Sequence, residues 1–343
     1  MSTDKIFIRT VANPVSGMGH LSRMLTLATD FKSVGYECVF GIEKCAPVAA
    51  EKLNSAGFVQ GDLPSGCQIV IYDLIDAVWY EDRAVLFREI SQHREVGRKV
   101  VLFDGRGKAS YRMTPKAAKV DFLVAPYVGE DPNQEGVGIN FLTGPSFFPL
   151  ATGFCGHSPK NISRAVRNVL ITAGGADPFG ASAFMLEAVL KAFSKENVEI
   201  HLVVGSMFND ETIEKIEDIS QGYGRLIFCH QGLSDLSDLM KCADLCLCAN
   251  GLTKYELVAL GVPTIVVSIN AENHSINLEF ENSKTVVLAG ELGQLSVKEL
   301  SEIIVQLTEN VDQREQLSQL GRQLIDGNGL ERIRARIGLE TQC

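Results

Sequence analysis

Short apolar runs alternate with longer amphipathic stretches along the first part of this chain. The runs have the length of buried β-strands and cover residues 5–10, 37–41, 69–73, 99–104 and 121–125. The stretches between them carry apolar residues at helical spacing and predict helices near 21–34, 47–56 and 81–94. Such alternation is typical of a parallel sheet whose strands are joined by crossover helices.

Residues 128–160 interrupt this pattern, because Gly, Pro, Asn and Ser are frequent there and no period is sustained. The alternation then resumes. Further strands are expected at 168–172, 199–204, 226–230, 245–248, 264–267 and 285–288, and helices at 181–193, 233–242, 254–260 and across 296–325. The two arrays predict an α/β protein with two doubly wound domains, residues 1–155 and 156–343, that face each other across a cleft.

Composition narrows the class of protein. The length of 343 residues suits two domains at roughly 150 residues each. The 32 Lys and Arg against 42 Asp and Glu give a net charge of -10, which argues against bulk binding to nucleic acid or anionic membranes but allows a small anion site. The nine cysteines show no Cys-x-x-Cys spacing, so neither zinc nor thiol redox chemistry is expected. No apolar window approaches the roughly 18 residues of a membrane span, and we expect a cytoplasmic protein.

The first candidate site follows the first predicted strand. Gly17 and Gly19 allow a sharp turn and a close approach of the backbone to a ligand, and the helix start after them could receive an anion. His20 at this turn could hold or move a proton near neutral pH. The alternative is a structural histidine that is hydrogen-bonded at a strand-to-helix turn.

The second and third candidate sites follow strands of the second array. Gly174 and Gly175 could pass close to a ligand, with Asp177 as the N-cap of a helix that has Pro178 in its first turn; the alternative is simply a well-capped helix. The third site, which includes Glu256, is a small-residue turn whose amides could face a diphosphate. Its binding candidates are Asn250, Gly251, Thr253 and Glu256. The Glu256 carboxylate could accept both hydroxyls of a ribose, or it could be a surface group near a positive helix end.

Other polar residues carry less weight. A loop is expected at 271–275, where Asn273 and His274 could contact sugar hydroxyls or phosphate, or merely cap the next helix. His230 reads as structural. Asp73 and Asp104 close apolar strands of the first array, and either could line the site or cap a loop.

The motifs together resemble a known family. The segments 17–23, 171–178 and 249–263 are similar to those of the UDP-sugar hydrolases of the pseudaminic acid pathway and the SpsG-like proteins of spore coat polysaccharide synthesis, which are relatives of MurG-type glycosyltransferases. The resemblance implies the GT-B fold. It implies a nucleotide diphosphate held mainly by the second domain, with Glu256 on the ribose, His20 as the catalytic histidine, and Arg23 among the substrate-binding residues.

The chain departs from this family in three places. Residues 144–151, at the joint between the two arrays, lack the arginine that the family usually has there. Residues 104–107 stand where the family usually has a paired acidic run. His274 follows Asn273, whereas relatives tend to have Asn followed by Gln. Because the resemblance implies that these segments lie on the sugar-facing side, the nucleotide is better supported than the identity of the sugar.

The resulting expectation is hydrolysis of a UDP-sugar at the bond between the anomeric carbon and the diphosphate oxygen, in the synthesis of a nonulosonic acid or a surface polysaccharide. His20 would position or deprotonate the water, and amides near Gly19, Gly175 and Gly251 would stabilise the leaving diphosphate. No metal or cofactor is required. The alternatives are a glycosyltransferase, for which phenylalanines near the joint could form an acceptor face, and a non-catalytic nucleotide-sugar-binding partner protein.

Overall fold

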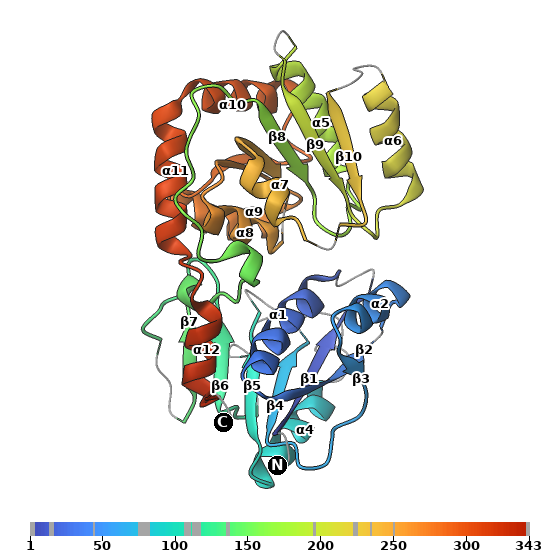
Figure 1. Ribbon diagram of the computed structural model, residues 1–343, viewed down its shortest axis with the longest axis vertical. Helices are drawn as coiled ribbons and strands as arrows, with labels where there is room; N and C mark the ends of the chain where they lie inside the picture. Colours follow the sequence, from blue (N-terminus) through green and yellow to red (C-terminus); the bar gives the residue numbers. More distant parts are fainter. Residues whose placement is uncertain are drawn as a thin grey trace. The chain divides into compact units, whose positions relative to one another are not determined.

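The protein divides into two compact units, one formed by Met1–Leu150 with Gly327–Cys343 and the other by Ala151–Asp326. The structure is a computed structural model, and it describes residues 4–13, 17–43, 45–74, 83–105, 111, 118–134, 138–194, 197–221, 226–233, 235–249 and 251–340. Each unit contains one sheet of parallel strands with helices packed against it (Figure 1). No helix in these ranges is both long and apolar enough to cross a membrane.

The sheet of the first unit has the strand order β3-β2-β1-β4-β5-β6-β7. Its strands are β1 (Lys5–Val11), β2 (Glu37–Glu43), β3 (Val59–Gln60), β4 (Ile69–Asp73), β5 (Lys99–Phe103), β6 (Phe122–Ala125) and β7 (Asn140–Thr143). Its helices are α1 (Gly19–Ser33), α2 (Pro47–Ser55), α4 (Arg83–Glu95) and α12 (Gly329–Ile337). The strands β3 and β7 were not expected, and β7 lies within the stretch that the sequence indicated as loops.

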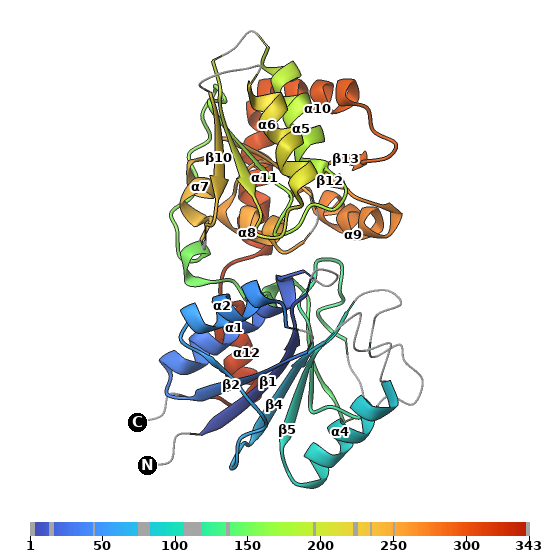
Figure 2. The same ribbon diagram turned by 90° about the vertical axis from the view of Figure 1, so that its right-hand side faces the viewer.

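Helices cover both faces of this sheet. Helix α1 carries Leu21, Met24, Ala28 and Phe31 at helical spacing, and these side chains pack with Ile8 and Phe40 on one face. Helix α4 turns Leu86 and Ile90 to the other face, against Val70 and Val100. The two faces are easiest to separate in Figure 2, where α1 and α4 lie on opposite sides of the strands.

The C-terminal helix α12 belongs to the first unit. The expected division at residue 155 placed all later residues in the second domain, whereas the structure returns 327–343 to the first. The reason is an apolar stripe of Leu330, Ile333 and Ile337, which is buried in the same core as α1. The chain passes so closely at Gly329 that a Cβ there would lie 2.1 Å from the carbonyl oxygen of Phe148.

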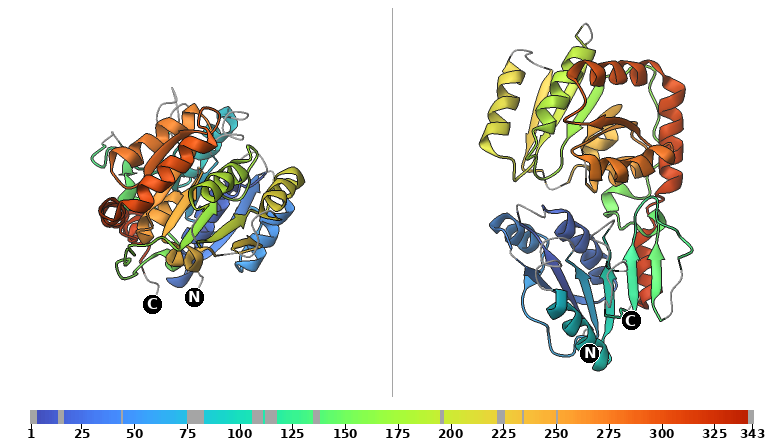
Figure 3. Two further views of the ribbon diagram at one scale, coloured as in Figure 1. Left: turned by 90° about the horizontal axis from the view of Figure 1, so that it is seen from above. Right: turned by 180° about the vertical axis from the view of Figure 1, so that it is seen from behind.

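The sheet of the second unit has the order β10-β9-β8-β11-β12-β13. Its strands are β8 (Asn168–Thr172), β9 (Glu199–Val204), β10 (Ile227–Gln231), β11 (Leu245–Cys248), β12 (Thr264–Ser268) and β13 (Val287–Glu291). Its helices are α5 (Ala181–Ala192), α6 (Asp210–Gln221), α7 (Ser237–Cys242), α8 (Thr253–Leu260), α9 (Ala271–Asn282), α10 (Val297–Glu309) and α11 (Val311–Leu324). Helices α10, which packs beside α5, and α11, which packs beside α8, are seen from behind in Figure 3.

In both sheets the order in which consecutive strands are added reverses once. In the first, the order runs outward from β1 toward β3 on one side and from β4 toward β7 on the other. In the second, the corresponding neighbours are β8 and β11. The loops that leave neighbouring strands at such a switch point diverge, which opens a ligand site at the carboxyl ends of the strands. Asp73 closes β4, beside the end of β1 that leads to His20.

Candidate functional site

A histidine and a buried carboxylate meet at the switch point of the first sheet. His20 is the second residue of α1, and its Nδ1 lies 2.7 Å from Oδ1 of Asp73, the last residue of β4. The Asp73 side chain is fully buried, whereas 16% of the His20 side chain is exposed. Because Nδ1 faces a carboxylate, we assign its proton to Nδ1, which leaves Nε2 as the basic nitrogen.

Arg23 holds the other side of this carboxylate. Its Nε donates to Asp73 Oδ2 at 2.9 Å and its Nη2 donates to Oδ1 at 2.7 Å, a two-pronged ion pair. His20 and Arg23 are three residues apart on α1, so they share one face of the helix. Burial alone would raise the pKa of Asp73, but the charges and hydrogen bonds of Arg23 and His20 outweigh it and lower the pKa to about 2. Asp73 is therefore ionised at neutral pH beside the imidazole.

Two further residues extend the network across the sheet. Arg23 Nη1 donates to the Tyr127 hydroxyl at 3.0 Å, and that hydroxyl donates to the carbonyl oxygen of Asp104 at 2.8 Å. The Asp104 carboxylate accepts from the backbone amides of Gly105 and Tyr111. We call His20, Asp73, Arg23 and Tyr127 the His20 network. It joins α1 to the end of β4 and to the segment after β6, and Tyr127 links it to Asp104 after β5, so the imidazole is held from several elements.

The sequence indicated only part of this arrangement. It identified His20, gave Asp73 little weight and placed Arg23 among the substrate-binding residues. In the structure Arg23 is 4% exposed and its guanidinium is engaged by Asp73 and Tyr127, which suits positioning of the pair. Two signals were present in the sequence: an aspartate that ends a wholly apolar strand, and an arginine one helical turn after the histidine.

The glycines before His20 differ in their roles. Gly17 has a φ of 71°, which L side chains rarely adopt, and its amide donates to the carbonyl oxygen of Asn13 at 2.8 Å. Gly19 is the first residue of α1. A tight turn at Gly17 therefore delivers the chain into the helix with His20 in its first turn.

The Gly174 loop follows β8, and its acidic residue, Asp177, accepts hydrogen bonds from the chain's own backbone. The Asp177 carboxylate accepts from the amides of Ala181 and Ser182, each at 2.8 Å. The sequence had suggested Asp177 as the N-cap and Pro178 in the first turn of the helix. Both expectations are wrong, because α5 starts at Ala181 and its N-cap residue is Gly180. The start of α5 is nevertheless capped by Asp177 through this loop, and its first amides already have an anion.

The segment that follows β9 approaches this loop very closely. The amide of Met207 donates to the carbonyl oxygen of Gly175 at 2.9 Å. A Cβ on Gly205 would lie 2.5 Å from the carbonyl oxygens of both Gly174 and Gly175. The loop is therefore in close contact with Gly205, where any side chain would force the backbone to shift.

The start of α8 is built differently. Asn250 lies outside the described residues. Gly251 has a φ of 109°, and Thr253 is the first residue of the helix. The N-cap residue is Leu252, whose side chain has no oxygen with which to accept from the first amides. Glu256 is half-buried in the first turn. The start of α8 therefore has no side-chain acceptor at its N-cap, and it carries a carboxylate in its first turn.

The segment 271–275 is the first turn of α9 rather than a loop. Asn270 is its N-cap, and the Asn270 side-chain oxygen accepts from the amide of Asn273 at 2.9 Å. His274 is half-buried, and within the described residues its buried Nδ1 has no hydrogen-bond partner. His230 pairs with His201 at 3.0 Å between ring nitrogens, in keeping with a structural role.

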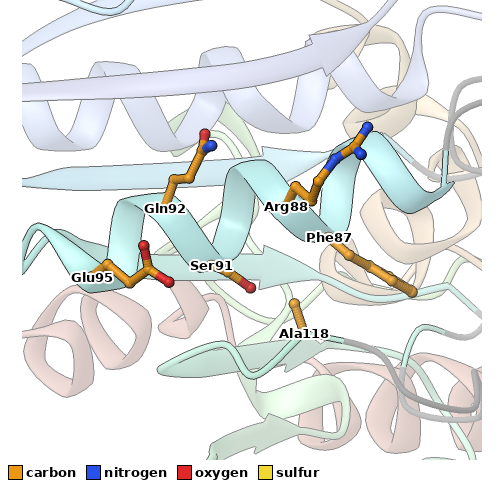
Figure 4. Close-up of a pocket in the computed structure, with 6 residues that line it drawn as sticks. All are labelled: Phe87, Arg88, Ser91, Gln92, Glu95 and Ala118. Carbon is orange, nitrogen blue, oxygen red and sulfur yellow. The ribbon is translucent and has the colours of Figure 1, made fainter.

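Two other features of the described residues lie outside these groups. A surface hollow runs along α4 and contains none of the predicted site residues (Figure 4); it is lined by Phe87, Arg88, Ser91, Gln92, Glu95 and Ala118. In the ranges that the structure covers, no group of three or more His, Cys, Asp or Glu side chains could hold a metal ion.

Comparison with known proteins places the fold. No family model matches the chain. An uncharacterized protein of Methanocaldococcus jannaschii is 25% identical over 281 residues, which is 78% of this chain and 56% of that protein, so the match spans little more than half of the relative. The spore coat polysaccharide biosynthesis protein SpsG of Bacillus subtilis is 24% identical over 336 residues, which is 93% of each chain.

Solved structures agree over nearly the whole length. MurG of Acinetobacter baumannii superposes with a TM-score of 0.65 at 15% identity and covers 97% of this chain and 99% of its own. MnaA of S. aureus, solved with UDP, has a TM-score of 0.62 at 13% identity over 99% and 98%. The chain has the GT-B fold. The expectation of two doubly wound α/β domains is thereby confirmed.

Proposed function

We propose that this protein is an enzyme that hydrolyses a nucleotide-activated sugar, with UDP as the carrier, in the synthesis of a surface polysaccharide or nonulosonic acid. The observation that carries the proposal is the His20–Asp73 pair at the switch point of the first sheet. The named role of SpsG and the UDP in the MnaA structure support the substrate class.

The pair suits a general base. As a water oxygen forms a bond to the anomeric carbon, Nε2 of His20 takes the water proton and the bond from that carbon to the diphosphate oxygen breaks. The electron pair of that bond leaves with the diphosphate, so UDP and a free sugar are produced. The imidazolium that forms is stabilised by the Asp73 carboxylate, which stays ionised because Arg23 holds it.

The second unit supplies the nucleotide site in this proposal. Amides at the start of α8 are donors for the diphosphate, and the half-buried Glu256 carboxylate is an acceptor for the two ribose hydroxyls. The start of α5 contributes less than the sequence suggested, because Asp177 already occupies its amides. The Gly174–Gly175 backbone and the first turn of α9 remain candidates for contacts to the phosphates or the sugar.

Product analysis tests the proposal. The protein is incubated with a mixture of UDP-sugars, with and without sugar or peptide acceptors, and the products are identified by mass spectrometry. We expect UDP and free sugar from the wild type and at least about 100-fold slower release from His20→Asn. The control is His201→Asn, which removes a histidine of the second unit and should leave turnover unchanged.

Two other outcomes replace the proposal. Sugar attached to an acceptor indicates a glycosyltransferase, in which the same histidine deprotonates a hydroxyl in place of water. Binding of UDP-sugar with no product in either case indicates a non-catalytic binding protein.

A further inference from the structure

A lysine that this chemistry does not use is buried beneath the start of α8. Lys254 is the second residue of that helix and is only 4% exposed. Its Nζ donates to Oδ1 of Asn277, and the Asn277 amide donates to the Ser268 hydroxyl at 2.9 Å. The ammonium also lies 4.9 Å from the centre of the Phe280 ring. A buried ammonium is costly to desolvate, so a role for its charge is worth seeking in the groups around it.

The charge sits at the carboxyl edge of the sheet. Ser268 is the last residue of β12, and Asn277 lies in α9. Cys248, the last residue of β11, also interacts with this ammonium. Burial raises the pKa of the Cys248 thiol to about 12, and the charge of Lys254 opposes that rise. The ammonium therefore lies near the ends of two neighbouring strands, β11 and β12.

The neighbouring helix starts sharpen the inference. The first amides of α5 are taken by Asp177 and an amide of α9 by Asn270, whereas the N-cap of α8 is a leucine. Among these three helices of the second unit, α8 is the one with a buried lysine in its first turn. Positive charge from both sources favours an anion at the same place.

We propose that Lys254 is a positioning residue for the nucleoside diphosphate, whose buried ammonium adds positive charge beneath the start of α8 and holds that helix against α9. The inference rests on the proposed function. In a poorly screened interior a charge acts over several ångströms, so Lys254 favours the diphosphate over the uncharged nucleoside without contacting either.

The test compares the affinities for UDP and uridine, measured by equilibrium dialysis. Lys254→Met keeps the length of the side chain and its packing on Phe280 but removes the charge. We expect UDP binding to weaken about 10-fold or more and uridine binding by less than about threefold. Lys298→Met, which removes a 72% exposed lysine of α10, is the matched control and should change neither affinity.

A second variant separates charge from packing. Lys254→Met removes the hydrogen bond from Nζ to Oδ1 of Asn277, so the double variant Lys254→Met with Asn277→Leu replaces both partners with apolar groups. The proposal requires this double variant to lose the preference for UDP as well. Equal weakening of UDP and uridine, or no weakening, overturns the role of Lys254 and leaves the proposed function intact. Failure of the wild type to bind UDP overturns both.

Discussion

The ion pair between Arg23 and Asp73 gives the sharpest prediction, because both groups are buried. Asp73→Asn keeps the shape of the side chain and removes its charge. Arg23 then retains a buried guanidinium with a hydrogen bond to Tyr127 but no counter-charge. His20 loses the anion that fixes its proton on Nδ1, and an amide nitrogen in that place could stabilise the opposite tautomer.

The structure sets the size of both effects. The pKa of Asp73 is about 2 against an ordinary 3.8, a difference of roughly 2 units that corresponds to about 2–3 kcal/mol in favour of the ionised form. Stranding one partner of a buried pair costs about 3–5 kcal/mol. We therefore expect Asp73→Asn to lower the free energy of unfolding by about 2–5 kcal/mol. Turnover of the surviving folded protein should fall by about 100-fold or more, while UDP affinity changes little.

The stability effect has a defined pH dependence. Because the folded pKa of Asp73 is depressed, its stabilising contribution is present above the ordinary value of 3.8 and is lost as the pH falls toward 2. The difference between wild type and Asp73→Asn should be constant near neutral pH and shrink below about pH 4.

Denaturant unfolding and steady-state kinetics measure these effects. The control is Asp121→Asn, which removes another carboxylate of the same unit. Asp121 pairs with Arg94, is 29% exposed and precedes β6, at the amino ends of the strands. This substitution should cost only about 1 kcal/mol, with turnover unchanged. A folded Asp73→Asn protein with wild-type stability and turnover would refute the reasoning. So would additive costs in Asp73→Leu, Arg23→Met and their double variant, since a true pair must be coupled.

Three further predictions concern single positions. Glu256→Ala should weaken UDP binding by about 1.5–3 kcal/mol, the range for hydrogen bonds to a charged group; an unchanged affinity in calorimetry removes Glu256 from the site. Gly205→Ala should displace the Gly174–Gly175 loop, lower the free energy of unfolding by about 1–3 kcal/mol and weaken UDP binding, and a variant with wild-type melting temperature and affinity contradicts that contact. Burial lowers the pKa of His93, with Arg98 adding to the effect and Glu89 opposing it. Its neutral form therefore stabilises the fold above about pH 6.5, and the stability of the wild type should fall more than that of His93→Gln between about pH 7 and pH 5.

The strands were the most predictable part of the fold. Buried parallel strands are continuous apolar runs with polar or turn residues at both ends, so β4, β8, β9 and β11 have the predicted bounds. The strand β7 was not predicted, because it is short, half-exposed and flanked by residues typical of loops. The first turn of α9 was predicted as a loop, because its residues, Asn273 and His274 among them, are polar and partly exposed.

The C-terminal helix shows a different limit. Its apolar stripe is visible in the sequence, but the choice of the core that it joins depends on which surface is left uncovered after both sheets have formed. That surface is the side of the first sheet where α1 also packs, which is why 327–343 returns to the unit that the chain had left.

The sequence drew attention to His20, Asp73 and Arg23, but it indicated neither Tyr127 nor the pairing among these residues. His20 and Asp73 are 53 residues apart, and nothing local indicates that the loop after β1 should meet the end of β4. They meet because β4 inserts beside β1, with Thr10 in register with Asp73, while β2 and β3 lie on the other side. Once that order is known, an aspartate that ends the neighbouring strand is the nearest anion to a histidine in the first turn of α1. The proposed role of His20 as a base thus depends on the order of the strands, and a chain with this fold and the same glycine-histidine turn but an apolar residue at the end of β4 should lack an oriented base.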